Sequence, residues 1–277
     1  MNAGQRTVAV ETDGLRWAVR VAGEGPAMLL LHGFTGSARS WDELMAATAA
    51  VGCTMIAPDL PGHAGTAWRA GGVTVERTAE DLADLLHALR YERAHVVGYS
   101  MGARIALRLA VAHPACVVRL VLEAPSAGIA DPGERSARRA ADESLALVLE
   151  RDGSVPFVDA WEAMPVLAGE ARLGAGARAS LRTIRLGHHP AGLAASLRGA
   201  GQGAMEPLHD RLGEISSPTL VIVGRDDPAR DRAAAVAAGI PGARLAVIDG
   251  AGHAPHLEAP LAFSRLVLDF VSEEHVA

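Results

Sequence analysis

The fold is decided by the stretch Val96-Val97-Gly98-Tyr99-Ser100-Met101-Gly102-Ala103-Arg104-Ile105-Ala106-Leu107. An apolar β run over residues 94–97 breaks at Gly98, and an Ala- and Leu-rich helical pattern begins after Gly102. Residues 98–102 match the G-x-S-x-G pattern, in which glycines permit a strand-to-helix turn so tight that the serine hydroxyl stands exposed. The stretch therefore predicts Ser100 as a nucleophile. The alternative is a serine that only caps the helix.

The segments on both sides of this stretch alternate between strand and helix patterns. Two short runs with period-two alternation flank Asp13-Gly14, which predicts an antiparallel hairpin at a sheet edge. Further apolar runs suit buried strands, and the segments between several of them keep helical spacing. The strand runs cover residues 27–31, 54–57, 117–122, 219–224 and 245–248, and the helical patterns cover residues 76–89, 229–238 and 260–271. This order predicts an α/β fold with a mostly parallel sheet flanked by helices.

The alternation stops between Ser126 and Leu212. This segment contains helical patterns at residues 136–149 and 176–186 and no convincing strand. We therefore predict a helical cap over residues 126–212, inserted into a core formed by residues 1–125 and 213–277.

Composition limits the possible functions. The chain has 277 residues, of which 49% are hydrophobic and 21% charged, and no apolar run approaches the roughly 18 residues of a membrane span. The net charge of -6 argues against a nucleic-acid partner, because such a protein needs a basic face. The N-terminal segment lacks the apolar core of a signal peptide, and the two cysteines are far apart in sequence, so we expect a cytoplasmic protein.

An activated serine needs two partners. Its hydroxyl is a weak base and nucleophile at neutral pH unless a histidine takes its proton and an acid orients that histidine. Asp227 closely follows the predicted strand at 219–224, and His253 closely follows the one at 245–248. The three residues follow one another along the chain in the order serine, aspartate, histidine, which is the order found in triads whose serine lies in a G-x-S-x-G turn. We predict Ser100, Asp227 and His253 as the triad, with Asp226 and His256 as alternatives for the acid and the base.

An oxyanion formed next to Ser100 would need two N–H donors. One usually belongs to the residue after the serine and the other to the loop after an earlier strand. These positions fall on Met101 and on Phe34, which follows His32-Gly33. The alternative for the Phe34 segment is a plain turn at the end of a strand.

Over its full length the chain resembles the α/β-hydrolase fold superfamily. The motifs that carry the resemblance are Leu31-His32-Gly33-Phe34, Asp59-Leu60-Pro61-Gly62-His63, Gly98-Tyr99-Ser100-Met101-Gly102, residues 224–227 and Gly250-Ala251-Gly252-His253. A narrower resemblance, to the 2-succinyl-6-hydroxy-2,4-cyclohexadiene-1-carboxylate synthases of menaquinone biosynthesis, rests on residues 100–104, 134–142, 157–161 and 190–199.

The narrower resemblance implies a lyase rather than a hydrolase. Members of that family eliminate pyruvate from a substrate with three carboxylates, and their substrate-binding residues correspond here to Tyr99, Arg104, Arg138, Trp161 and Arg185. Guanidinium groups bind carboxylates bidentately, which suits a small anionic polycarboxylate. The alternative for each arginine is a solvated surface position, because arginine is the only basic residue type other than histidine in this chain.

The resemblance further implies that no metal or organic cofactor is needed. The sequence contains neither a His/Cys ligand cluster nor a phosphate-binding glycine loop. A rival interpretation with the same triad is a carboxylesterase or a carbon–carbon bond hydrolase. A member of the fold that only binds a small molecule is a third possibility.

Overall fold

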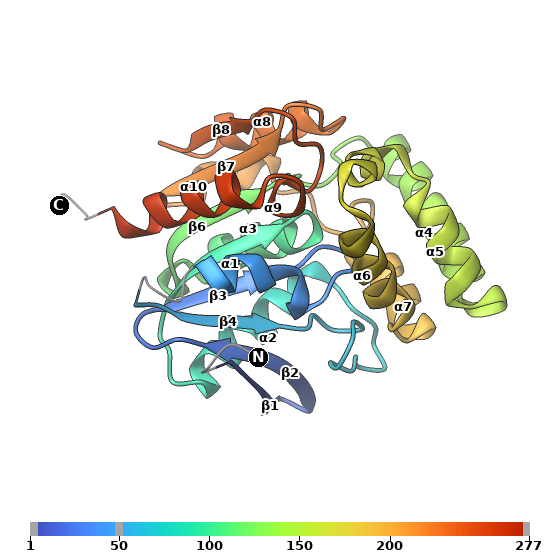
Figure 1. The fold of residues 1–277 in the computed structure, drawn as a ribbon, viewed down its shortest axis with the longest axis horizontal. Coiled ribbons are helices and arrows are strands. Elements are labelled where there is room, and N and C mark those ends of the chain that lie inside the picture. The colour runs from blue at the N-terminus through green and yellow to red at the C-terminus, as the bar shows by residue number, and fades with distance from the viewer. Residues whose placement is uncertain (1–4, 48–51, 274–277) are drawn as a thin grey trace.

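A computed structural model of the chain describes residues 5–47 and 52–273, and within them one sheet has eight strands in the order β1-β2-β4-β3-β5-β6-β7-β8. β1 and β2 form an antiparallel hairpin, β2 pairs antiparallel with β4, and every other neighbouring pair is parallel. The strands are β1 (Arg6–Thr12), β2 (Leu15–Ala22), β3 (Ala27–Leu31), β4 (Thr54–Pro58), β5 (Ala94–Tyr99), β6 (Val117–Glu123), β7 (Thr219–Gly224) and β8 (Arg244–Ile248) (Figure 1).

Burial explains the two strand patterns in the sequence. Every residue of β3, β4 and β7 is buried, as expected for central strands covered on both faces. In β2 fully buried residues alternate with more exposed ones, because this strand belongs to the hairpin at the edge of the sheet. The continuous runs at residues 27–31, 54–57 and 219–224 therefore predicted buried strands correctly. The run at residues 245–248 instead forms β8 at the other edge of the sheet, where Leu245 and Val247 are exposed.

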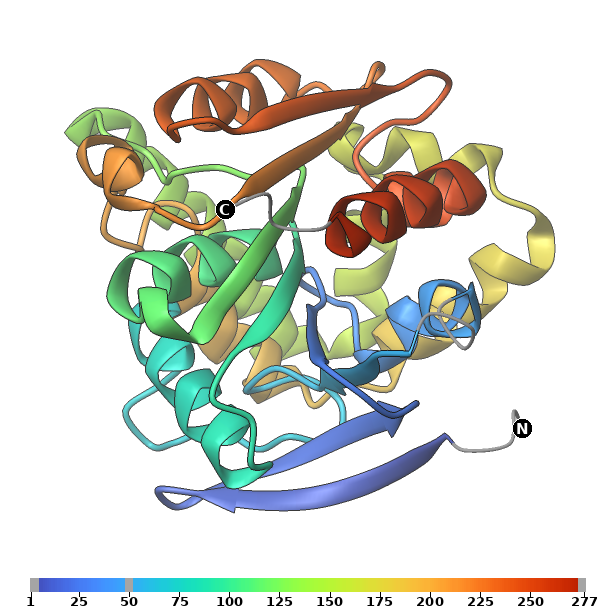
Figure 2. The ribbon, with the colours of Figure 1, turned by 90° about the vertical axis from the view of Figure 1, so that its left-hand side faces the viewer.

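Helices cover both faces of the sheet, and each face has its own apolar cluster. One cluster joins the sheet to α2, α3 and α8, and the other joins it to α1 and α10. Figure 2 shows α1 and α10 on one side of the sheet and α2 and α3 on the other. These helices are α1 (Asp42–Ala47), α2 (Val75–Ala88), α3 (Met101–Ala112), α8 (Arg230–Gly239) and α10 (Pro260–Ser272); the short α9 (Pro255–Glu258) precedes α10.

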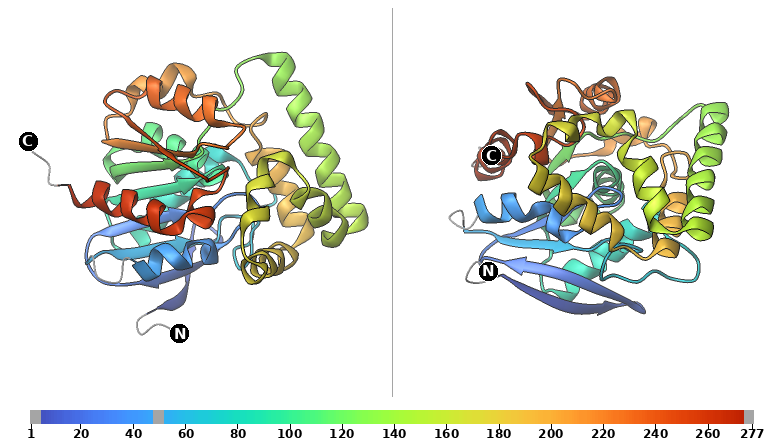
Figure 3. Two further views of the ribbon diagram at one scale, coloured as in Figure 1. Left: turned by 45° about the horizontal axis from the view of Figure 1, so that its top comes forward. Right: turned by 45° about the vertical axis from the view of Figure 1, so that its right-hand side comes forward.

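The segment between β6 and β7 is helical. Figures 1 and 3 show its helices standing together beyond one end of the sheet. The segment consists of α4 (Pro132–Asp152), α5 (Ser154–Glu162), the 3-10 segment η4 (Pro165–Arg172), α6 (Ala175–Leu186) and α7 (Pro190–Ala200), followed by a second 3-10 segment, η5 (His209–Glu214). A separate apolar cluster, which includes Leu149, Phe157 and Leu193, holds α4, α5 and α7 together. We propose on this basis that residues 126–212 form a cap, whose return segment docks Leu208 and Leu212 onto the core cluster.

The structure confirms the predicted α/β architecture and adjusts some boundaries. β5 continues through Gly98 to Tyr99, so the strand ends two residues later than the apolar run indicated. α4 begins earlier than its apolar pattern, because the Asp131 side chain caps it and Pro132 occupies its first turn. None of the helices in the described part of the chain has both the length and the apolar character needed to cross a bilayer.

Candidate active site

Ser100 occupies the turn between β5 and α3 in a strained conformation. Its φ of 50° and ψ of -103° lie where non-glycine residues are uncommon, and its N–H donates to the carbonyl of Glu123 at 2.9 Å. A Cβ on Gly98 would lie 2.5 Å from the carbonyl oxygen of Gly102, and one on Gly102 would lie 2.1 Å from that of Leu31. Both glycines are therefore required for this turn, which explains the spacing in the sequence.

The structure brings Ser100, His253 and Asp227 together. His253 Nε2 lies 3.0 Å from Ser100 Oγ, and His253 Nδ1 lies 3.0 Å from Asp227 Oδ2. The second oxygen of Asp227 accepts the N–H of Ala229 at 2.8 Å, which fixes the orientation of a carboxylate whose side chain is fully buried. The arrangement lets the imidazole take a proton from the serine while the carboxylate holds the other ring nitrogen.

The loop that carries Asp227 and the loop that carries His253 pack closely, backbone against backbone. A Cβ on Gly224 would lie 2.1 Å from the carbonyl oxygen of Gly252. Of the two alternatives considered from the sequence, Asp226 lies 3.5 Å from a guanidinium nitrogen of Arg172, and His256 Nδ1 lies 2.9 Å from Glu123. In this structure neither takes the place of Asp227 or His253 beside Ser100.

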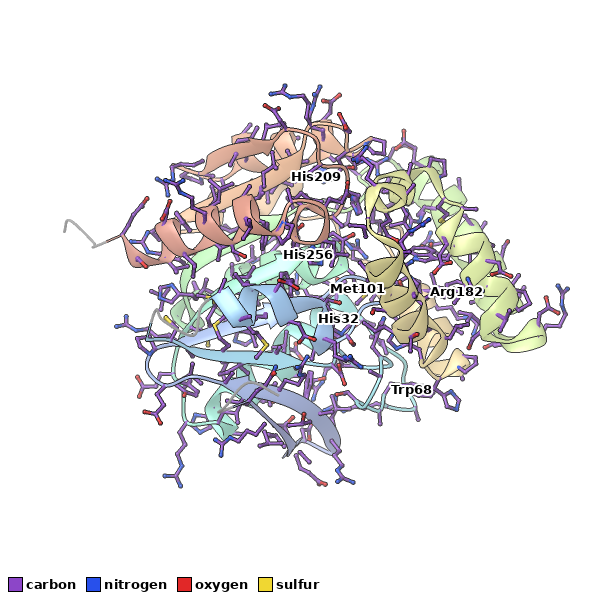
Figure 4. The ribbon with its side chains drawn as sticks, in the orientation of Figure 1. His32, Trp68, Met101, Arg182, His209 and His256 are labelled. Atoms are coloured by element: carbon purple, nitrogen blue, oxygen red, sulfur yellow. The ribbon has the colours of Figure 1, made fainter. Side chains whose placement is uncertain are left out.

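The two predicted oxyanion donors, Phe34 and Met101, both line the same pocket as Ser100. Met101 is the first residue of α3, where N–H groups have no partner within the helix. The carbonyl of Gly33 accepts from His32 Nδ1 at 2.8 Å and from the N–H of Gly36 at 3.0 Å. The C=O of Gly33 and the N–H of Phe34 belong to one trans peptide and point in opposite directions, so the Phe34 N–H points away from the His32 ring and the Gly36 N–H. Figure 4 labels His32 and Met101 where the sheet meets the cap helices.

The five residues suggested for substrate binding also line this pocket. They are Tyr99, Arg104, Arg138, Trp161 and Arg185. Trp161 packs edge-on against the ring of Phe34, with centroids 5.0 Å apart. Burial raises the pKa of Tyr99 well above its usual value, so this phenol stays neutral. The pocket therefore combines aromatic walls with cationic groups.

Arg104 is the least compensated of the three arginines. It is 6% exposed, its Nη2 donates to the carbonyl of Ala200 at 2.8 Å, and its Nε has no hydrogen-bond partner among the described residues. Burial, together with the neighbouring Arg138, lowers the pKa of Arg104 to about 9, while Asp142 acts in the opposite direction. The group is still charged at neutral pH, and within residues 5–47 and 52–273 no carboxylate forms an ion pair with it.

Arg138 and Arg185 differ in how many carboxylates they meet. Arg138 Nε donates to Asp142 at 2.9 Å, and its Nη1 reaches Gln202 at 3.3 Å. Arg185 Nη2 contacts both oxygens of Glu170, at 2.6 and 2.8 Å, and its Nη1 donates to Glu162 at 3.1 Å. Burial opposes its charge, but the bonds to Glu170 and Glu162 raise the pKa of Arg185.

Several residues that line the pocket were not singled out from the sequence. Arg232, in the core helix α8, lines the pocket and donates to Gln202 at 3.4 Å. Asp142 and Glu170 provide the carboxylates next to the cap arginines. Asp142 lies at the end of the stretch 134–142 that carries the narrower resemblance, but nothing in that stretch assigned it a role, and no local motif marks Glu170 or Arg232.

Comparison with known proteins assigns the chain to a family. A sequence model of a protein family, described as alpha/beta hydrolase fold, matches residues 26–260, so the chain belongs to the alpha/beta hydrolase fold family. A protein of Bacillus subtilis (strain 168) named "Putative 2-succinyl-6-hydroxy-2,4-cyclohexadiene-1-carboxylate synthase" is 36% identical, covering 94% of this chain and 96% of the relative. The 2-succinyl-6-hydroxy-2,4-cyclohexadiene-1-carboxylate synthase of Enterobacter sp. (strain 638) is 30% identical, covering 86% of this chain and 88% of the relative.

Solved structures show the same relationship. MenH from S. aureus aligns with a TM-score of 0.86 and 27% identity, covering 97% of this chain and 98% of that structure. A thermophilic esterase from Thermogutta terrifontis, solved with malate bound, aligns with a TM-score of 0.83 and 28% identity over 97% and 98% of the two chains. The chain is thus similar in structure to both a synthase-type protein and an esterase, so the residues of the pocket must distinguish the reactions.

Proposed function

We propose that this protein eliminates pyruvate from 2-succinyl-5-enolpyruvoyl-6-hydroxy-3-cyclohexene-1-carboxylate to give 2-succinyl-6-hydroxy-2,4-cyclohexadiene-1-carboxylate in menaquinone biosynthesis. The names of relatives aligned over most of the chain support this reaction. The observation that carries the proposal is a single pocket that holds the Ser100–His253 pair together with Arg104 and Arg138. A small anionic polycarboxylate would use these guanidiniums, whereas a neutral ester has no need of them.

In the proposed reaction the triad acts as a base. His253 draws the proton from Ser100, whose oxygen removes the ring proton α to the succinyl ketone. The resulting enolate oxygen lies against the N–H groups of Phe34 and Met101. Collapse of the enolate through the ring double bond breaks the carbon–oxygen bond to the enolpyruvyl group. The leaving enolpyruvate takes up a proton and becomes pyruvate, so the reaction consumes no water and needs no oxidant.

The substrate-binding residues are assigned different parts in this proposal. Arg104 and Arg138 bind carboxylates, because together they meet only Asp142 among the carboxylates of the described residues. Tyr99 and Trp161 form aromatic walls for the ring. Arg185 contributes fewer free donors, because Glu170 and Glu162 already occupy part of its guanidinium.

A carboxylesterase or carbon–carbon bond hydrolase remains the second candidate, because it would use the same triad and because an esterase shares the fold. The discriminating experiment measures pyruvate release from the enolpyruvyl substrate and cleavage of p-nitrophenyl esters with the same enzyme preparation. The proposal predicts efficient pyruvate release and weak ester cleavage. Efficient ester cleavage without pyruvate release would favour the hydrolase.

We also propose the cytoplasm as the site of this reaction. The relatives that align over most of the chain are named as synthases of a small-molecule metabolite, which fits a cytoplasmic enzyme.

A further inference from the structure

We infer that an ion pair between the cap and the core, Arg172 with Glu258, positions the loop that carries His253. Glu258 is the last residue of α9, and its side chain is 2% exposed. Its carboxylate accepts the N–H of Gly252 at 2.8 Å through Oε2 and the N–H of Ala254 at 3.1 Å through Oε1. These two amides flank His253, so one carboxylate holds the backbone on both sides of the histidine.

Arg172 provides the third donor to this carboxylate and comes from the cap. Its Nη2 donates to Glu258 Oε2 at 2.7 Å, and its Nη1 lies 3.5 Å from Asp226 Oδ2. Asp226 directly precedes Asp227, the acid beside His253. A single guanidinium at the end of η4 therefore contacts both loops that supply partners to Ser100.

The local sequence leaves room for this carboxylate. A Cβ on Gly169, in η4, would lie 2.3 Å from Glu258 Oε2, and a Cβ on Gly252 would lie 3.2 Å from both carboxylate oxygens. A side chain at residue 169 would displace the carboxylate, and one at residue 252 would crowd it. A buried carboxylate requires hydrogen-bond donors, and here two backbone amides and one guanidinium supply them.

The expected consequence concerns the geometry and the charge around His253. Proton transfer requires the 3.0 Å contact between His253 Nε2 and Ser100 Oγ, and a displacement of about 1 Å costs on the order of 100-fold in rate. Replacing Glu258 removes a negative charge close to His253, whereas replacing Arg172 removes a positive charge. The two changes therefore bias the protonation of a nearby imidazole in opposite directions.

The test measures the triad directly, without the proposed substrate. It rests on the proposed roles of Ser100, His253 and Asp227 and does not depend on pyruvate elimination. The measured quantity is the second-order rate constant for phosphonylation of Ser100 by a fluorophosphonate, followed across pH by mass spectrometry for Glu258→Gln and Arg172→Gln. We expect Glu258→Gln to slow labelling by about 10-fold or more and to move the midpoint of the pH–rate profile down. Arg172→Gln should move that midpoint up.

An exposed ion pair of the same residue types provides the control. Arg211 Nη2 lies 2.8 Å from Glu214, and both side chains are more than a third exposed. Glu214→Gln and Arg211→Gln should leave the labelling rate and its pH midpoint unchanged.

Two results would overturn the inference. If both variants label as fast as wild type with the same midpoint, the Arg172–Glu258 pair does not position His253. If wild-type Ser100 is not labelled at all, the assignment of the triad is wrong as well. Should Glu258→Gln fail to fold, the midpoint of Arg172→Gln decides alone, because the Arg172 side chain is 49% exposed and tolerates replacement.

Discussion

Replacing Arg104 with methionine should stabilise the protein while it disables the proposed reaction. Burial and the neighbouring Arg138 lower the pKa of Arg104 to about 9, which corresponds to a cost of about 5 kcal/mol for keeping the charge at this position, at about 1.4 kcal/mol per pH unit. Relaxation of the surroundings reduces this figure, and replacing buried ion pairs by apolar side chains is often neutral or stabilising by about 1–4 kcal/mol. We expect the free energy of unfolding to rise by about 1–3 kcal/mol. Methionine fills a similar volume without a charge.

The same change removes a carboxylate contact from the proposed substrate. The loss should be on the order of 2–4 kcal/mol, which corresponds to a fall in kcat/KM for pyruvate release of about 30- to 1000-fold. Unfolding is followed by circular dichroism in denaturant, and pyruvate release by a coupled assay. The control is Arg108→Met, one turn further along α3, where a partly exposed arginine pairs with Glu206 at 2.9 Å. That variant should change stability by less than about 1 kcal/mol and leave kcat/KM intact. A less stable Arg104→Met variant, or one with near-normal kcat/KM, would refute the reasoning.

Asp227→Asn should lower kcat for pyruvate release by about 1000- to 10000-fold while the fold stays intact, because His253 would lose its orientation and tautomer. Asp226→Asn should leave kcat unchanged. If instead Asp226→Asn lowers kcat and Asp227→Asn does not, Asp226 is the acid of the triad. Acid should destabilise the protein through three buried histidines, His32, His63 and His188, whose pKa values are all lowered by burial, that of His32 to about 4. Since the unfolded chain binds protons more readily, stability present above pH 6.5 is lost as pH falls toward 4, by about 3 kcal/mol for His32 alone. Denaturant unfolding curves that do not change between neutral and mildly acidic pH would contradict this expectation.

Much of the fold could be predicted because its signals are local. The buried strands β3 and β7 have continuous apolar sequences of the expected length, and the bounds from sequence match those in the structure. The hairpin formed around Asp13-Gly14 as predicted. The turn at Ser100 was visible because tight backbone packing requires glycine at residues 98 and 102.

Other features depend on contacts across the cap, which spacing does not specify. The two short helices α5 and α7 carry weak patterns, and they are held by packing against α4. Arg185 was a candidate through the resemblance to a known family, but no sequence pattern indicated that Glu170 would pair with it. Likewise, nothing local distinguishes Glu258, whose partners are two backbone amides and an arginine 86 residues away.

The choice between Asp226 and Asp227 also required the structure. Both residues follow the end of β7 closely, and the backbone turn after the strand determines which of the two carboxylates contacts His253. The Asp227 N–H donates to the carbonyl of Gly224, and that turn directs the Asp227 side chain inward, while Asp226 faces Arg172.

The most direct test of the proposed elimination is rapid-quench mass spectrometry of the intact protein during turnover of the enolpyruvyl substrate, with pyruvate measured in the same samples. A serine that only relays a proton forms no covalent intermediate, whereas a hydrolase passes through an acylated serine. We predict pyruvate release from the first turnover with Ser100 unmodified at every time point. A substrate-derived adduct on Ser100 that forms and decays as fast as pyruvate appears would contradict the proton-relay mechanism.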